Sequence, residues 1–341
     1  MTKEFLELLS KLSSAFGPSG CECRVLCIIG EELKSVCRCS TDRTGNLICH
    51  LPGKKGKMMI AANADETGFM ITDITDKGYI KFEATGSADP SCFVGKEMYV
   101  GNETELLSGI GGGKVLHLLK GGERSDAPGF DKLFIDVGQT GEELKKVLEK
   151  GDFAAYKGEL TQLSGGYVSG KALESRGGCA LLVQALKDAA NKSEKERPDI
   201  YAVFAVKEKA GLSGAVNAAY NLNPEKAILL GFAPSNDLDG VDKEKKAAIL
   251  GKGPVLPPRD GRALFYDASY FEEVKAAAEQ ASLPYQLLDV PSTLSASRLH
   301  EERAGIPTVS LRIPCFNPET TGVILHEDDL ENTLKLLNAL M

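Results

Sequence analysis

The chain passes from a strand-like run into a helix through Ala205-Val206-Lys207-Glu208-Lys209-Ala210-Gly211-Leu212. The same alternation continues through the second half of the chain: helix 175–190, strand 200–206, helix 211–220, strand 226–231, helix 270–281 and strand 308–313. Such alternation predicts a mostly parallel sheet with helices on both faces. Ligand sites in these sheets lie beyond the carboxyl ends of the strands. Asn63, Lys209 and Gly231, which end or follow three of the strands, are therefore predicted to meet at one edge of the sheet.

A different pattern occupies the middle of the chain. From about Thr67 short strands alternate with glycine-rich turns, and 69–72 and 79–82 read as a hairpin around Asp76-Lys77-Gly78. One helix-like piece, 141–150, interrupts them. We therefore predict an α/β fold: a three-layer αβα domain, residues 1–66 plus 164–341, interrupted by an inserted all-β, barrel-like domain, residues 67–163.

Composition excludes two classes of partner. The formal charge of −8 gives no basic field for nucleic acid. No stretch approaches the roughly 20 apolar residues that a membrane span needs. The first eleven residues alternate apolar and charged side chains and lack the apolar core of an export signal, so a cytoplasmic location is predicted.

Six of the nine cysteines fall within the first fifty residues. An odd total without an export signal predicts reduced thiols. A zinc site built from Cys21-Glu22-Cys23 and Cys37-Arg38-Cys39 is one interpretation, although paired zinc ligands usually have two to four residues between them. The alternative is that Cys23 and Cys27, four residues apart in a helix that runs to about Lys34, are small packing residues.

Several short motifs, in this order, resemble those of the tetrahedral metallo-aminopeptidases, a family that includes glutamyl and deblocking aminopeptidases and homologues labelled as cellulases. The motifs are Phe16–Gly20, Thr41–Leu47, Asn63–Met70, Val168–Arg176, Ala205–Leu212, Leu250–Val255 and Ala304–Thr308. They run nearly the whole length of the chain. The resemblance therefore implies the family's fold, with a zinc-aminopeptidase-like α/β domain and an inserted dimerisation domain.

The resemblance also assigns site residues. It implies that Glu208 is the general base for the attacking water and that Asp65 orients a metal ligand. The family's five metal-ligand positions correspond to Asn63, Glu174, Lys209, Gly231 and Glu319. None of the five keeps the family's residue, and both ligand histidines are replaced.

These replacements bear on the cofactor. The family uses two zinc or cobalt ions, whereas the ammonium of Lys209 has no lone pair to give a metal. We therefore expect no metal cofactor, with Lys209 acting as a fixed positive charge among the carboxylates. A single hard cation such as Ca²⁺ or Mg²⁺, held by the oxygens of Asn63, Glu174 and Glu319, is the alternative.

Other candidate residues carry weaker signals. Asp237 and Asp239 could replace the acid lost at Gly231, although an Asp-x-Asp-Gly run is more often a surface turn. Gly109–Lys114 resembles half of a phosphate loop, but Val115 stands where Ser or Thr is needed, so a flexible turn is favoured. In Ser292–Ala296, Leu294 replaces an aspartate of the family's loop. The four histidines, His50, His117, His300 and His326, share no common spacing.

Three functions follow from this reading. The favoured hypothesis is an aminopeptidase homologue with a degraded dinuclear metal site, inactive or redirected, that binds peptide-like ligands. The alternatives are an active metal-dependent aminopeptidase that uses shifted ligands and a structural partner of an active paralogue. The family's architecture implies a homo-oligomer, from a dimer up to a dodecamer.

Overall fold

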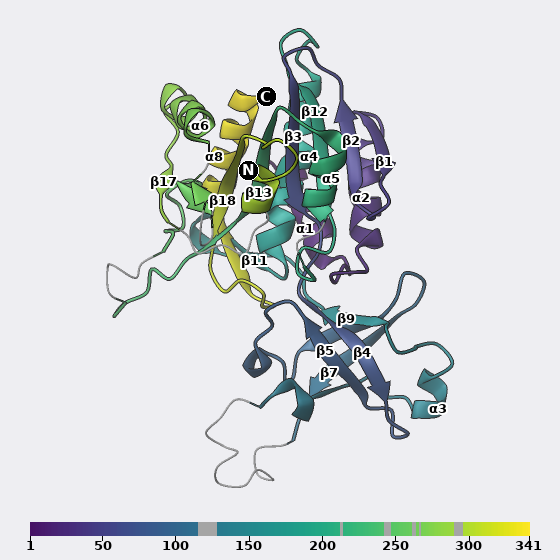
Figure 1. Ribbon diagram of the computed structural model, residues 1–341. Helices are drawn as coiled ribbons and strands as arrows, with labels where there is room; N and C mark the ends of the chain where they lie inside the picture. Colours follow the sequence, from purple (N-terminus) through teal and green to yellow (C-terminus); the bar gives the residue numbers. More distant parts are fainter. Residues whose placement is uncertain (115–127, 212–213, 242–246, 261–263, 266, 290–295) are drawn as a thin grey trace.

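The computed structural model describes residues 1–341 except 115–127, 212–213, 242–246, 261–263, 266 and 290–295. It has two lobes, a mixed α/β lobe and a smaller β lobe attached to one end of it (Figure 1). The β lobe is a closed barrel. The predicted fold class, an α/β domain with an inserted barrel-like all-β domain, is therefore confirmed.

The α/β lobe is built on an eight-stranded sheet in the order β1-β2-β12-β3-β13-β18-β14-β17. In that order the strands are Arg38–Thr41, Leu47–Leu51, Asp199–Ala205, Lys57–Asn63, Lys226–Pro234, Thr308–Cys315, Val255–Leu256 and Gln286–Leu287. The four central strands, β12, β3, β13 and β18, are parallel. They are almost entirely buried and apolar, as expected for parallel strands covered on both faces.

Helices cover both faces of this sheet (Figure 1). They are α1 Lys3–Ser14, α2 Cys23–Leu33, α4 Leu173–Ala190, α5 Gly214–Leu222, α6 Ala268–Gln280, α7 Ala296–His300 and α8 Glu327–Leu340. The crossover that contains α4 joins β3 to β12, and the crossover through α5 joins β12 back across β3 to β13. Because both crossovers are expected to be right-handed and they run in opposite directions, α4 and α5 lie on opposite faces.

Short elements complete this lobe. They are β10 Thr161–Gln162, β11 Tyr167–Gly170 and β19 Val323–His326 in a three-stranded sheet, the hairpin β15 Arg259–Asp260 with β16 Leu264–Phe265, and the 3₁₀ turn Ser164–Gly166. Among the described residues, none of the helices combines the length and apolarity that a membrane span requires.

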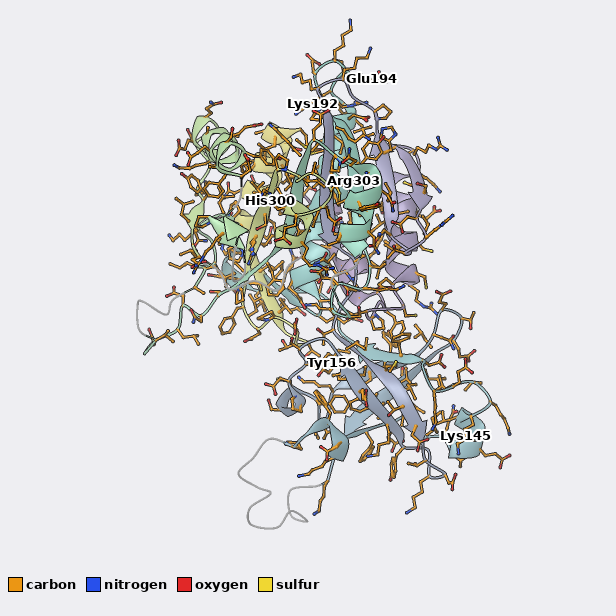
Figure 2. All side chains as sticks on the ribbon, in the orientation of Figure 1. Lys145, Tyr156, Lys192, Glu194, His300 and Arg303 are labelled. Atoms are coloured by element: carbon orange, nitrogen blue, oxygen red, sulfur yellow. The ribbon has the colours of Figure 1, made fainter. Side chains whose placement is uncertain are left out.

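The barrel closes in the order β4-β5-β8-β7-β6-β9. Its strands, in that order, are Gly68–Ile74, Ile80–Thr85, Phe134–Asp136, Leu106–Gly112, Glu97–Gly101 and Phe153–Tyr156, with α3 at Gly141–Leu144 and 3₁₀ turns at Pro90–Cys92 and Phe130–Lys132. Edge-to-face contacts of Phe69 with Phe82, Phe93 and Tyr156 fill its core. Figure 2 shows Tyr156 near the end of the barrel that meets the α/β lobe.

Two sequence predictions in the barrel fare differently. The hairpin is confirmed, since β4 and β5 pair antiparallel. The helix expected at 141–150 is only four residues long.

The barrel strands span Gly68–Tyr156, and β10 pairs with β11 outside the barrel. The domain division at 67–163 stays a proposal.

The glycine-rich run 109–114 is neither a phosphate loop nor a flexible turn. Most of it belongs to β7, inside the barrel wall, and Val115 lies outside the described residues. A Cβ atom on Gly111 would stand 2.4 Å from the carbonyl oxygen of Phe93. The glycines are therefore explained by close packing in a narrow barrel, which a single-sequence pattern does not distinguish from a loop.

The packing interpretation of two cysteines also needs correction. Helix α2 buries Val25, Ile29 and Leu33, which repeat every four residues on one face. Cys27 lies on a different face and is exposed, and Cys23 is half-buried. Cys27 is therefore not a core packing residue.

A buried charge network lies in the α/β lobe, beside the point where the chain leaves this lobe for the barrel. Lys171 Nζ donates to both carboxylate oxygens of Glu66 at 2.7 Å. Arg176 donates to Glu66 Oε1 at 3.4 Å, and the backbone N–H of Gly17 donates to the same oxygen at 3.0 Å. All three side chains are at most 4% exposed. One carboxylate is thus the shared partner of two buried cations.

We predict that Glu66→Gln destabilises the protein by about 3–5 kcal/mol, because it removes the carboxylate that two buried cations share. Urea unfolding of the full-length chain measures the change. The matched control is Glu97→Gln in the barrel, whose ion pair with Lys157 is largely exposed and should contribute less than about 1 kcal/mol. Equal losses of unfolding free energy in the two variants would contradict a stabilising role for the buried Glu66 network.

Candidate functional site

Three parallel strands deliver the predicted residues to one edge of the sheet. Asn63, the last residue of β3, is paired in register with Ala205, the last residue of β12. On the other side Ala62 is paired with Leu230 of β13, so Gly231 follows beside Asn63. The chain reaches Lys209 a few residues after β12. The prediction that Asn63, Lys209 and Gly231 emerge together is confirmed, as the strand-end rule for parallel sheets requires.

A cavity of about 210 Å³ lies at these strand ends. Six of the seven site residues predicted from the sequence line it: Asn63, Glu174, Glu208, Lys209, Gly231 and Glu319. The seventh, Asp65, is buried beside the cavity, where Oδ2 accepts the backbone N–H of Lys209 at 2.7 Å. The residues come from five separate parts of the chain, and the fold brings all seven together.

An ion pair crosses the cavity. Lys209 Nζ donates to Glu319 Oε1 at 2.6 Å, and the two side chains are 10% and 16% exposed. The backbone N–H of Glu319 donates to Glu174 Oε1 at 3.2 Å. Burial by itself would lower the pKa of Lys209, but the charges of Glu174, Glu319 and Asp65 raise that pKa above its usual value. Lys209 is therefore a fixed ammonium at neutral pH.

Buried oxygens around the ion pair lack partners. Asn63 Oδ1, Asp65 Oδ1 and Glu174 Oε2 make no hydrogen bond to any residue that the structure describes. Burial raises the pKa of both Asp65 and Glu174, although Lys209 works in the opposite direction on each. Because buried polar atoms are nearly always satisfied, these oxygens point to water, an ion or a ligand in the cavity.

Left-handed backbone flanks the cavity at three non-glycine residues. The φ angles are 56° at Ala172, 61° at Lys207 and 63° at Glu319. Such conformations cost on the order of 1–3 kcal/mol each and persist where the surrounding structure enforces them. Ala172 precedes the first turn of α4, which carries Glu174. Lys207 directly precedes Glu208, so the backbone at these positions is held to aim the cavity side chains.

Two residues that no sequence pattern assigned to the site hold the loop after β12. Glu22 Oε1 accepts the backbone N–H of Lys207 at 2.8 Å, and Ser19 Oγ accepts that of Ala210 at 3.2 Å. Burial raises the pKa of Glu22. The motif Phe16–Gly20 contains Ser19 and was the available signal, whereas nothing in the sequence marks Glu22.

The weaker candidates lie elsewhere. Asp237 and Asp239 are exposed and do not line the cavity, so the suggestion that they replace a lost acid is not supported. Among the described histidines, His50 pairs with Asp199, His300 contacts the carbonyl of Ile306, and His326 caps α8. Figure 2 shows His300 within the α/β lobe, away from the barrel. His117 and Leu294 lie outside the described residues.

Comparison with known proteins assigns the family. Residues 45–336 match the family of M42 glutamyl aminopeptidases. The chain belongs to this family. It is similar to the lysyl aminopeptidase of Pyrococcus furiosus, with 27% identity over 98% of this chain and 96% of that protein. The metallo-aminopeptidase resemblance drawn from the motifs is therefore confirmed.

Solved structures agree with the M42 assignment. The aminopeptidase APDkam598 of the archaeon Desulfurococcus kamchatkensis superposes with a TM-score of 0.91 at 30% identity, over 98% of this chain and 94% of that one. The TET1 peptidase of Pyrococcus horikoshii gives a TM-score of 0.87 at 28% identity, over 98% of both chains. That peptidase can assemble into a tetrahedron or a large octahedral shell.

M42 membership overturns the prediction about the cofactor. M42 aminopeptidases are dinuclear metal enzymes, so the expectation that no metal cofactor takes part is wrong. The residues of this chain fit such a pair of ions only in part. The unpaired oxygens of Asn63 and Glu174 are suitable metal ligands. Lys209 is not, because its ammonium has no lone pair, and its Nζ also pairs with Glu319, another ligand position.

We predict that Lys209→Met destabilises the protein by about 3–5 kcal/mol at pH 7, because it leaves the buried Glu174 and the largely buried Glu319 without their ammonium. The raised pKa of Glu174 should rise further without Lys209. A carboxyl group with a raised folded pKa loses stability as pH rises, so the difference from the wild type should be larger at pH 8 than at pH 5.

Urea unfolding at several pH values measures this difference. Lys226→Met is the matched control, since its pairing with Glu273 is exposed and should be worth less than about 1 kcal/mol. A Lys209→Met variant as stable as this control at every pH would rule out a structural role for the cavity ion pair.

Proposed function

We propose that this M42 homologue binds the amino end of a peptide-like ligand in the cavity at the strand ends and does not hydrolyse it by the route of its family. The Lys209–Glu319 ion pair carries the proposal. It places a fixed ammonium at a position that the resemblance assigns to a metal ligand.

The remaining groups suit a ligand with a primary ammonium. Glu174, Glu208 and Glu319 line one small cavity with a single lysine, so the carboxylates outnumber the cation. An incoming ammonium would relieve their mutual repulsion and would satisfy the unpaired Glu174 Oε2. Charge-assisted hydrogen bonds of this kind are stronger than neutral ones, so they favour a peptide N-terminus over a blocked one.

An active aminopeptidase is the second candidate. Its support is that Glu208, the base position, lines the cavity, and that Asn63 and Glu174 keep unpaired oxygens there. Membership of a family of metal enzymes favours it as well. A structural partner of an active paralogue, the third hypothesis, has no specific observation in its favour.

Hydrolysis of aminoacyl-nitroanilides separates the two candidates. With zinc, cobalt or manganese supplied, we expect wild-type turnover to equal the background rate. A variant with the family's ligands restored should exceed this background rate at least tenfold. The restored variant carries Asn63→His, Glu174→Asp, Lys209→Glu, Gly231→Asp and Glu319→His. Adding Glu208→Gln to the restored variant should abolish the gain, since a general base contributes roughly 10²–10⁴-fold. Robust wild-type turnover that disappears in Glu208→Gln would establish the active enzyme instead.

We also propose a homo-oligomer, with a dimer as the minimum. The argument rests on the barrel, which is complete here and closed, and on the shells that the similar TET1 peptidase forms. The cytoplasmic location stays a prediction from the sequence.

Light scattering of the purified chain at micromolar concentration should give at least twice the mass of 36.4 kDa. Dilution to nanomolar concentration provides the control, because a concentration-dependent mass identifies true association. A mass of one chain at the higher concentration would refute the proposal.

A further inference from the structure

Three cysteine thiols converge at the edge of the central sheet. Cys37 directly precedes β1, Cys39 lies on β1, and Cys49 stands opposite Cys39 on β2. The three Sγ atoms lie within 4.8 Å of one another. Cys21 and Cys23 are not members of this group, so the zinc site that pairs them with Cys37 and Cys39 is wrong. The third member comes instead from the neighbouring strand.

The sulfur positions suit a shared central ion. Cys39 Sγ and Cys49 Sγ are 2.9 Å apart, whereas even carbon atoms in ordinary contact stay roughly 3.5–4.0 Å apart. An ion at about 2.3 Å from each of three sulfurs would hold them about 3.8 Å apart. Small side-chain movements therefore convert the observed cluster into a ligand set.

Burial favours a bound cation over free thiolates. Cys49 is fully buried in the main core, while Cys37 and Cys39 are half-buried and pack against it. Isolated thiolates in such surroundings are costly. A cation would offset that cost, and the partial exposure of Cys37 and Cys39 gives it a path from solvent.

The ligand set contains sulfur alone. Across the described part of the chain, no imidazole or carboxylate joins the three thiols. His50 follows Cys49 along β2, but strand alternation turns it to the opposite face. There it pairs with Asp199 at 2.7 Å and stacks on Tyr201. Soft thiolate ligands select soft ions such as Cu(I) and Zn(II), and a three-ligand zinc site keeps an open fourth position.

We propose that Cys37, Cys39 and Cys49 form a binding site for one soft metal ion, Cu(I) or Zn(II), at the edge of the sheet and apart from the cavity at the strand ends. Three S–metal bonds form, three S–H protons leave to solvent, and no electron is transferred. The bound ion fastens the edge strand β1 to β2 and to the end of α2.

The test uses the reduced, full-length protein under anaerobic conditions, titrated with Cu(I) in one arm and with Zn(II) in another. Co(II) serves as the spectroscopic probe in the zinc arm. We expect one ion per chain, accompanied by thiolate-to-metal charge-transfer absorption. This readout reports sulfur ligation only, so an ion in the carboxylate cavity does not contribute to it. The arm with the tighter binding identifies the ion.

Substitutions locate the site. Cys37→Ser should weaken binding at least tenfold, and Cys39→Ser repeats the test independently of how Cys37→Ser folds. The matched control is Cys27→Ser, which removes an exposed thiol outside the group and should bind as the wild type does. Equal charge-transfer absorption in the wild type and in all three variants would overturn the proposal. So would the absence of sulfur-based absorption, or a Cys39–Cys49 disulfide as the only product.

Discussion

The carboxylate of Glu66 connects the point where the chain leaves the α/β lobe with two distant parts of the same lobe. It accepts hydrogen bonds from Lys171 and Arg176, around the start of α4, and from the backbone N–H of Gly17 in the loop after α1. Burial lowers the pKa of Lys171, and Glu66 counters that effect. Removing one partner of a buried ion pair is strongly destabilising, so the three remote parts of the chain that meet at Glu66 depend on one another.

The same network positions the cavity. Asp65 directly precedes Glu66 and accepts the backbone N–H of Lys209. Glu174 lies between Lys171 and Arg176, at the first turn of α4. Fixing Glu66 and its two partners therefore fixes the backbone on both sides of the cavity. The ion pair of Lys209 with Glu319 lies nearly buried between these segments.

Alternation of strands and helices predicted the parallel sheet and the meeting of Asn63, Lys209 and Gly231 at its edge, and the short strands with glycine-rich turns predicted the barrel. The other lining residues, Glu174, Glu208 and Glu319, came from the resemblance to the metallo-aminopeptidases. The patterns failed where tertiary packing decides. Gly111 reads as a loop residue, yet it lies in a strand that passes close to Phe93. Glu22 holds the loop after β12 from a distant helix start, a contact that no local spacing encodes. The meeting of Cys49 with Cys39 depended on strand register, which the sequence left open.

The barrel also governs how the parallel sheet can form. Strands β3 and β12 are neighbours, with Asn63 opposite Ala205, although the whole barrel and α4 separate them along the chain. Within the barrel, β4 pairs with β9 from Phe69 to Ala154, so its two ends already lie together once it has closed. A barrel that folds first replaces a long flexible loop by a short one. Non-local pairing is slow because loop closure must precede it, and a closed barrel shortens the loop that the pairing of β3 with β12 has to close.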